Sequence, residues 1–176
     1  MYQRLFLGNK TLQLNQVNST NSYLKEYLAV NSNQVEGFVV FAQHQISGRG
    51  QKDTVWESEK GMNLTFSILL KPNLPVQNQF LLSKIVSIGM VCFLEDLGLN
   101  DLKIKWPNDI YCKDKKIAGI LIENTLKGSK INNSVVGIGL NVNQISFQSE
   151  NNPTSIALET GTNQYDLENL LHQLLF

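Results

Sequence analysis

The chain has 176 residues, 42% of them apolar, and its fifteen Lys and Arg residues balance fifteen Asp and Glu residues. This length and composition are typical of a single domain with a real hydrophobic core. A formal charge of zero disfavours a broad nucleic-acid surface, which needs a basic face, but allows a local cluster of positive charge.

Strands and helices follow one another without strict alternation. In chain order the pattern predicts a strand at 11–16, a helix that starts at Ser19-Thr20-Asn21, a buried strand at 37–42, a loop at 43–55, a strand at 62–70, a long and mostly buried helix at 78–97, a strand at 102–106, a hairpin of 110–112 and 116–126, a strand at 135–142, and helices at 153–159 and 167–175. This order favours an α+β fold, a mixed β-sheet with packed helices, over a doubly wound sheet. We expect residues 1–176 to form one domain.

The last predicted helix, 166–176, carries a stripe of leucines that reaches the end of the sequence without a cap. Such a stripe indicates either continuing sequence or a partner surface. Cys92 and Cys112 lie in apolar or strand-like contexts without metal-ligand spacing, so we expect both to be buried free thiols in a reducing compartment. No signal-like stretch opens the chain and no run approaches the length of a membrane span. We therefore expect a cytoplasmic domain without a membrane partner.

The densest cluster of chemically active side chains is the predicted hairpin from Lys105 to Glu123. It brings Lys105, Asn108, Asp109 and Lys116 onto one short and rigid piece of sheet. Cations and a carboxylate held close together on rigid backbone suit phosphate chemistry. Because lysine is rarely buried without a partner, both lysines are expected to pair with Asp109, directly or through a metal ion. The alternative is a structural ion pair.

Two further stretches are expected to face this hairpin. Glycines on either side of Arg49 let the backbone approach an anion, although a tripeptide of this kind is more often part of a plain turn. The strand 135–142 carries Gly137 and Gly139 on one face, continued by Asn141. These glycines suit either a flat ligand or close helix packing. Trp56 is either a core anchor or an aromatic wall.

Taken together, these motifs resemble the catalytic domain of the biotin–protein ligases, also called biotin–[acetyl-CoA-carboxylase] ligases. The motifs that carry the resemblance are Ser19-Thr20-Asn21, the loop Gln45–Gln51 with Trp56, Lys105-Trp106-Pro107-Asn108-Asp109, Lys116–Leu121 and Gly137–Asn141. The resemblance covers roughly residues 10–160. It implies an α+β fold related to class II aminoacyl-tRNA synthetase cores and to lipoate ligases.

The family's activity has two steps. ATP and biotin form biotinoyl-5′-AMP, and a lysine of a biotin carboxyl-carrier domain then takes the biotinoyl group. The resemblance implies ATP and Mg²⁺ as co-substrate and activator, biotin as substrate, and no tightly bound metal or nucleic acid. Pairing of strand edges into a homodimer is a further expectation. The alternatives are a lipoate or octanoyl transferase of the same fold, and a non-catalytic or truncated module that binds biotin or its adenylate.

The resemblance also implies roles for individual residues. Catalytic roles fall to Lys116, Arg49, Lys105 and Asp109, and Asp109 is also a candidate magnesium ligand. Nucleotide contacts are implied for Trp56, Asn108 and Asn141. Substrate contacts are implied for Ser19, Thr20, Asn21, Gln45, Gly48, Gly50, Gln51, Gly119, Ile120, Gly137 and Gly139.

Some features depart from the family pattern. Gln51 stands where some relatives carry a second arginine, and Asp53 stands where a glycine is common. Relatives usually continue into a small β-barrel-like domain, and some begin with a DNA-binding winged helix. With the chain starting almost at the catalytic motifs, we do not expect repressor activity.

Overall fold

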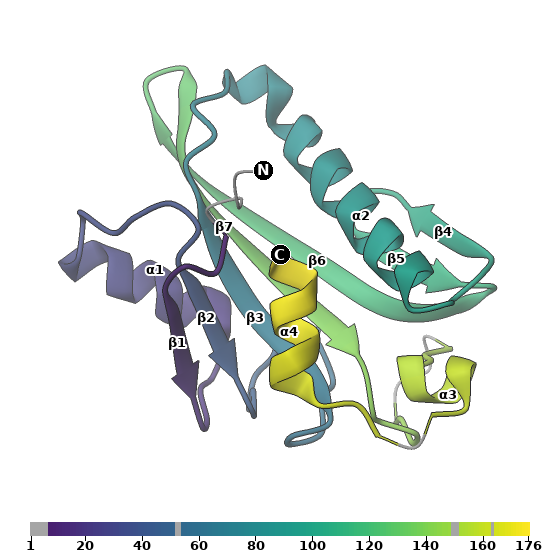
Figure 1. The fold of residues 1–176 in the computed structure, drawn as a ribbon. Coiled ribbons are helices and arrows are strands. Elements are labelled where there is room, and N and C mark those ends of the chain that lie inside the picture. Colours follow the sequence, from purple (N-terminus) through teal and green to yellow (C-terminus); the bar gives the residue numbers. More distant parts are fainter. Residues whose placement is uncertain (1–6, 52–53, 149–151, 163) are drawn as a thin grey trace, which may run out of the picture.

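The computed structural model describes residues 7–51, 54–148, 152–162 and 164–176. Within this part of the chain a seven-stranded sheet has the order β1-β2-β3-β7-β6-β5-β4 (Figure 1). The strands are β1 (Thr11–Leu14), β2 (Val39–Ala42), β3 (Asn63–Leu70), β4 (Leu102–Lys105), β5 (Asp109–Cys112), β6 (Lys115–Lys127) and β7 (Lys130–Asn141). β1 and β2 pair in parallel and the remaining neighbours are antiparallel. The predicted mixed sheet with packed helices is confirmed.

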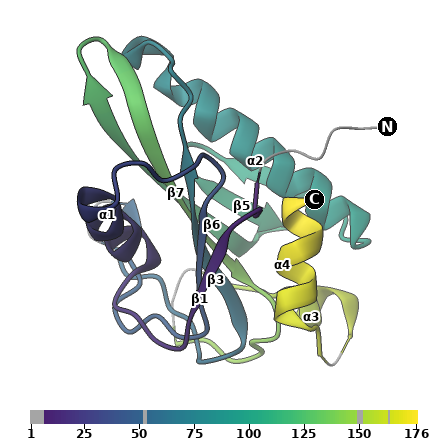
Figure 2. The ribbon, with the colours of Figure 1, turned by 60° about the vertical axis from the view of Figure 1, so that its left-hand side comes forward.

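The helices lie on both faces of the sheet. They are α1 (Thr20–Val30), a short 3₁₀ helix at Val76–Asn78, α2 (Gln79–Asp96), α3 (Ile156–Thr160) and α4 (Leu167–Leu175). Figure 2 shows α1 on one side of the sheet and α2 and α4 on the other. Side-chain alternation explains this arrangement, because successive residues of a strand point to opposite faces. In β7, Val136, Ile138 and Leu140 join the core shared with α2 and α4, whereas Val135 joins the smaller cluster around Leu24 of α1.

The same alternation decides which residues are left for a site. Gly137 and Gly139 lie on the α1 face of β7, and Ser67 of β3 pairs with Gly137 across the sheet. On β6, Gly119 pairs with Gly139 and Leu121 with Gly137. Since α1 covers only part of this face, the small and polar residues beyond its N-terminus form the floor of a cavity.

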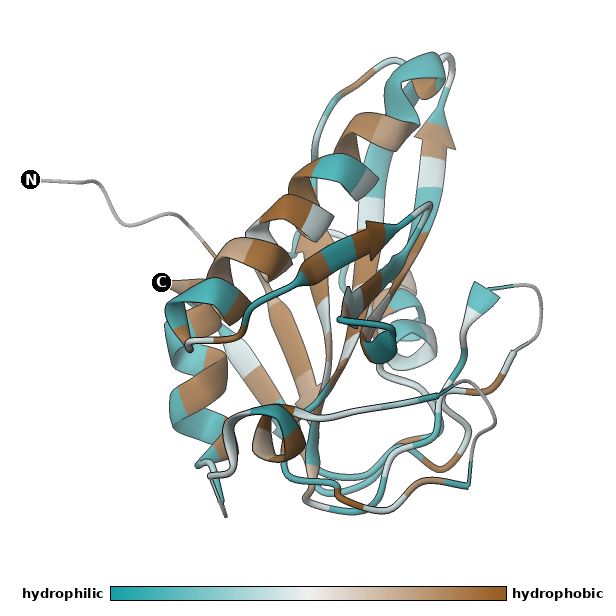
Figure 3. Cartoon of the chain, turned by 90° about the vertical axis from the view of Figure 1, so that its right-hand side faces the viewer, coloured by the Kyte–Doolittle hydropathy of each residue, from teal (hydrophilic) through white to brown (hydrophobic). Residues whose placement is uncertain are grey.

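Helix α2 differs from its prediction. It packs Leu82, Met90 and Leu94 into the core, but Ile85 and Ile88 are 65% and 55% exposed, so the expected mostly buried helix is wrong. Cys92 is exposed, contrary to prediction, while Cys112 is buried and burial raises the pKa of its thiol. Figure 3 shows that apolar residues dominate the helix, so the periodicity could not show that only one side is covered.

The expectation that no run approaches the length of a membrane span is wrong. By length and composition alone, Val76–Asp96 is apolar enough to cross a membrane, although the structure packs one side of this segment on the sheet. Of the two alternatives given for the leucine stripe of α4, the partner surface is not needed, because Leu170, Leu171 and Leu175 are buried in the core of the domain itself. A stripe of apolar residues predicts burial, but the sequence does not identify the surface that buries it.

Candidate active site

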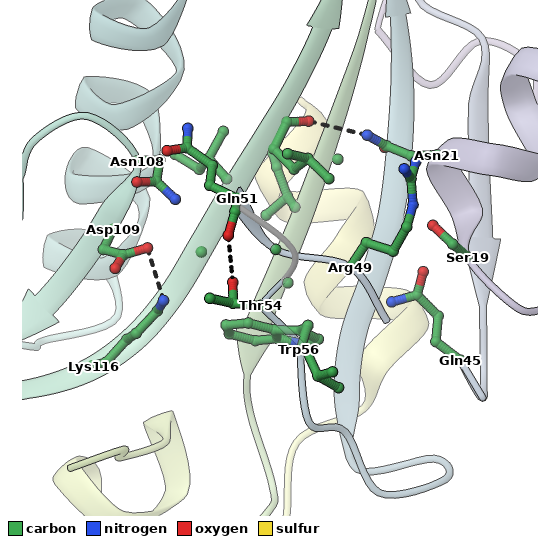
Figure 4. A pocket seen from close by; sticks show the side chains of 18 of the residues that line it. Ser19, Asn21, Gln45, Arg49, Gln51, Thr54, Trp56, Asn108, Asp109 and Lys116 are labelled. Atoms are coloured by element: carbon green, nitrogen blue, oxygen red, sulfur yellow. Dashed lines mark hydrogen bonds and ion pairs between the residues drawn. The ribbon is translucent and has the colours of Figure 1, made fainter. Parts of the chain in front are cut away.

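One cavity of about 250 Å³ gathers nearly all of the predicted site residues. It lies on the α1 face of the sheet, between the start of α1, the loop around Arg49 and the β5–β6 hairpin (Figure 4). The residues that line it are Ser19, Thr20, Asn21, Gln45, Arg49, Gly50, Gln51, Thr54, Val55, Trp56, Lys105, Asn108, Asp109, Tyr111, Lys116, Gly119, Ile120, Leu121, Gly137, Ile138 and Gly139. Three stretches that are distant in the sequence therefore converge, as the motifs predicted.

Neutral hydrogen-bonding groups form one end of the cavity, where Thr20, Asn21 and Gln45 line it and the fully buried Ser67 supports Thr20 and Asn21. We call these four residues the amide end. The Gln45 Oε1 atom accepts from the Thr20 backbone N–H at 2.7 Å and from the Thr20 hydroxyl at 3.1 Å. The Ser67 hydroxyl donates to Asn21 Oδ1 at 2.6 Å and lies 2.8 Å from Thr20 Oγ1. These bonds fix the orientation of each group before a ligand arrives.

The start of α1 supplies this end. Ser19 is the N-cap residue of α1, which confirms the predicted helix start, although its side chain makes no capping hydrogen bond. Ser19, Thr20 and Asn21 are nonetheless buried and line the cavity. Gly137 has a packing role here, because a Cβ atom at this position would collide with the Asn21 side-chain amide. Close helix packing, one of the two alternatives for this glycine, is observed, and Gly137 also lines the cavity.

Three charged groups and one amide form the opposite end, which we call the charged end and define as Lys105, Asn108, Asp109 and Lys116. Lys116 Nζ lies 2.8 Å from Asp109 Oδ1, and the two side chains are 21% and 20% exposed. The predicted pairing of Lys116 with Asp109 is confirmed. Lys105 is exposed, and its ammonium lies 3.5 Å from the Tyr111 hydroxyl and over the ring of that tyrosine. The expected burial of Lys105 against Asp109 is therefore wrong.

A β-bulge aims Lys116 into the cavity. Ile110 pairs with Ala118 but Tyr111 pairs with Lys116, so β6 holds one residue more than β5 at this point. Ile117 and Ala118 are consequently both fully buried. The extra residue turns Lys116 to the face of Gly119, where its Cε atom lies 3.6 Å from the position of a Cβ on Gly119. Regular alternation would have pointed Lys116 into the core.

Trp56 lies between the two ends. Its indole covers the cross-strand pair of Gly119 and Gly139, because a Cβ atom on Gly139 would collide with the ring and one on Gly119 would come within 3.0 Å of it. The Lys116 ammonium lies 5.7 Å from the ring centroid. The indole N–H is buried and has no hydrogen-bond partner among the described residues. Trp56 is thus both an anchor on the sheet and an aromatic wall of the cavity.

The loop that carries Arg49 folds back on itself. The Trp56 N–H donates to the Gly48 carbonyl at 2.9 Å, and the Gly50 N–H donates to the Thr54 carbonyl at 2.7 Å. A Cβ atom on Gly48 would come within 2.5 Å of the Trp56 carbonyl oxygen. Gly48 therefore closes the loop and does not line the cavity, unlike Arg49, Gly50 and Gln51. Asp53 lies outside the described residues.

Asn141 is the second predicted residue that the structure keeps out of the cavity. Its side-chain N–H₂ group donates to the Thr154 carbonyl at 2.9 Å, and the residue is 3% exposed. The alternation of β7 correctly placed it on the face of Gly137 and Gly139, but the segment around Thr154 covers this end of the strand. Its expected contact with a nucleotide has no support in the cavity lining.

Sequence reasoning missed several lining residues and one supporting residue. Thr54, Val55, Tyr111, Leu121 and Ile138 line the cavity without having been predicted. Glu123 lies beside it and binds Arg49 and Lys25 at 2.8 Å and 2.6 Å. The signal for both was strand alternation, because Leu121 and Glu123 follow Gly119 by two and four residues and so share its face of β6.

In comparison with known proteins, residues 14–141 match the model of the biotin/lipoate A/B protein ligase family. The bifunctional ligase/repressor BirA of Bacillus spizizenii is 34% identical over 140 residues, which are 80% of this chain and 42% of that protein. The chain therefore spans about two fifths of the length of that relative.

Solved structures agree with this match. The biotin protein ligase of Aquifex aeolicus in complex with biotin and ATP superimposes with a TM-score of 0.77 and 32% identity, over 95% of this chain and 67% of that one. The Leishmania major enzyme in complex with biotinyl-5-AMP gives 0.74 and 25%, over 94% and 72%. This chain belongs to the biotin/lipoate A/B protein ligase family and corresponds to the catalytic domain of its biotin protein ligases.

Proposed function

We propose that this chain activates biotin with ATP as biotinoyl-5′-AMP and transfers the biotinoyl group to a lysine of a biotin carboxyl-carrier domain. The observation that carries the proposal is the polarity of the cavity, which has a neutral hydrogen-bonded end and a charged end separated by an aromatic wall. Biotin has the same polarity, since it carries a neutral ureido ring at one end and a carboxylate at the other.

The amide end suits the ureido ring, which presents one carbonyl acceptor and two N–H donors. Hydroxyl and amide groups with fixed orientations bind such a polar ring with specificity. A ligand with a mostly apolar ring end would leave these protein groups without hydrogen-bond partners. Trp56 provides apolar surface for the hydrocarbon part of the ligand. The carboxylate would then lie at the charged end, within reach of Lys116.

The first step places charge at this end. A biotin carboxylate oxygen attacks the α-phosphorus of ATP, a new O–P bond forms and the bond to pyrophosphate breaks. Negative charge grows on the phosphate oxygens, and the cations of Lys116 and Arg49 stabilise it. Mg²⁺ is usually held by one or two carboxylates together with phosphates, and Asp109 is the one carboxylate among the described lining residues. It fits the role of a ligand to a metal that arrives with the nucleotide.

In the second step the uncharged amine of the carrier lysine attacks the acyl carbon, AMP leaves and the amine loses a proton. A second cavity of about 210 Å³ shares Gln51, Asn108 and Ile120 with the first. Among the described residues, its lining combines amide side chains and Ser83 with Phe80, Pro107 and two isoleucines, and it has no lysine or arginine. It gives an adduct larger than biotin room to extend beyond the charged end.

The test combines the chain with biotin, ATP, Mg²⁺ and a purified carrier domain, and measures pyrophosphate release and biotin on the carrier. We expect both, and neither when biotin is omitted. Release with lipoate and not with biotin would replace the proposal with lipoate activation. Binding of biotin by calorimetry without any pyrophosphate release would instead indicate a binding module.

A further inference from the structure

Glu123 of β6 lies just outside the cavity and joins three donors from two distant segments. Its Oε1 atom accepts from Lys25 at 2.6 Å, and its Oε2 atom accepts from Asn21 at 2.9 Å and from Arg49 Nη2 at 2.8 Å. The side chain is 24% exposed. One carboxylate thus ties the start of α1 and the loop of Arg49 to the central sheet.

The charge balance of this cluster favours a positioning role. A carboxylate alone would cancel the charge of Arg49, but Lys25 adds a second cation, so the three side chains keep a net charge of plus one. Arg49 uses one Nη group on Glu123, and a guanidinium has five N–H donors in a fixed plane. With one Nη group bound to Glu123, the Arg49 guanidinium can still present its other N–H donors to the cavity that Arg49 lines.

The ionisation state of the Glu123 carboxylate is consistent with a positioning role. Burial raises the pKa of Glu123, but the hydrogen bonds from Lys25 and Asn21 and the charge of Arg49 outweigh burial and lower the pKa below its ordinary value. Glu123 is therefore ionised at neutral pH. Without this anchor, a 42% exposed arginine on a glycine-flanked loop would sample many rotamers.

We propose that Glu123 is a positioning residue that holds the Arg49 guanidinium at the cavity wall, so that an anionic substrate meets a cation already in place. The proposal rests on the proposed function for its effect on ATP, but not for its effect on Arg49. Preorganised donors stabilise developing charge better than mobile ones, because no reorganisation is needed during the reaction.

The chain offers a direct readout, because Arg4 and Arg49 are its two arginines. The side-chain Nε–Hε NMR spectrum of ¹⁵N-labelled protein should show two signals, and Arg4→Lys assigns them. We expect a rigid Arg49 signal, with a high heteronuclear NOE, in the parent protein. Glu123→Gln should reduce that NOE towards the value of a freely rotating side chain. Lys25→Ala is the matched control, since it removes the other ion pair of Glu123 and should leave the Arg49 signal rigid.

Kinetics test the consequence. Glu123→Gln should raise the KM for ATP about tenfold, the equivalent of one lost hydrogen bond to a charged group. Adding Glu123→Gln to Arg49→Met should change little, because Glu123 would have no guanidinium left to hold. A rigid Arg49 signal in Glu123→Gln, or additive losses in the double variant, would overturn the proposal. If the parent chain does not activate biotin, the proposed function fails, and the NMR comparison still decides whether Glu123 positions Arg49.

Discussion

The two ends of the cavity are built in opposite ways. At the amide end, Thr20, Asn21 and Ser67 are buried and hydrogen-bonded to one another, and the half-buried Gln45 is bonded to Thr20. At the charged end, the Lys116–Asp109 pair keeps about a fifth of its surface exposed. The amide end suits recognition of a ligand of one shape, because its groups cannot rearrange without losing their mutual hydrogen bonds. The charged end suits chemistry, because a charge near solvent can exchange its partner for a phosphate.

Breaking the charged end should have the largest effect on the proposed reaction. Lys116→Ala removes the cation that is proposed to contact the biotin carboxylate. It should slow biotin-dependent ATP–pyrophosphate exchange by about 100- to 1,000-fold. The cost in stability should be about 1–2 kcal/mol, since Asp109 loses its partner but remains partly solvated.

The matched control is Lys105→Ala, which removes an equal charge from an exposed position on the neighbouring strand β4. We expect a loss of less than about tenfold, because its ammonium contacts Tyr111 rather than the Asp109 pair. Equal losses in the two variants would show that only the total charge of this end matters. A Lys116→Ala variant that activates biotin at the parental rate would remove Lys116 from the mechanism.

Disrupting the packing of Trp56, which lies between the two ends, should have the second-largest effect. Gly139→Ala places a methyl group where the Trp56 indole now lies, and should destabilise the fold by about 1–3 kcal/mol. Urea unfolding in a Trp106→Phe background follows Trp56 alone, since the chain has two tryptophans. Gly89→Ala is the control, because nothing lies within 4 Å of its added methyl group and the substitution favours a helix. Equal stability of the two variants would contradict the packing role of Gly139.

A more local effect is expected at the amide end. Ser67→Ala leaves Asn21 Oδ1 without its donor, which should cost about 1–3 kcal/mol of stability and weaken biotin binding. Ser134→Ala serves as the control, since Ser134 is equally buried and donates to Asn124 at 2.7 Å, far along the same sheet. Calorimetric titration with biotin separates the two. If both variants bind biotin equally well, the hydrogen bonds of Ser67 serve the fold alone.

The sequence predicted the site better than it predicted the surroundings of the site. Motifs such as Lys105–Asp109 and Lys116–Leu121 located the hairpin, because their spacing is local and strand alternation assigns faces. Strand alternation could not predict the bulge at Ile117, since the bulge depends on how β6 pairs in register with β5. The role of Gly48 and the burial of Asn141 depend on segments that return from elsewhere in the chain. The exposed side of α2 was missed because a helix that is apolar all round does not indicate which side is covered.

An ion pair outside the cavity should give the smallest effect. Glu159 of α3 accepts from Lys113 Nζ at 2.8 Å and from the Thr154 hydroxyl at 2.7 Å. Burial raises the pKa of Glu159, but these hydrogen bonds and the charge of Lys113 lower it below the ordinary value of 4.5. The pair therefore contributes stability that is present above pH 4.5 and is lost as the pH falls through the lowered pKa of the folded state.

Glu159→Gln should make the urea midpoint depend less steeply on pH below 4.5 and leave the dependence above that value unchanged. Some acid dependence should remain, because the pKa of Glu123 is lowered as well. Glu123→Gln provides the comparison, since it should remove a similar part of the acid dependence while also affecting the KM for ATP. Biotin activation by Glu159→Gln at the parental KM would confirm that this pair serves the fold. An unchanged pH dependence of the urea midpoint below 4.5 would show that the Glu159 carboxylate is not held ionised by Lys113 and Thr154.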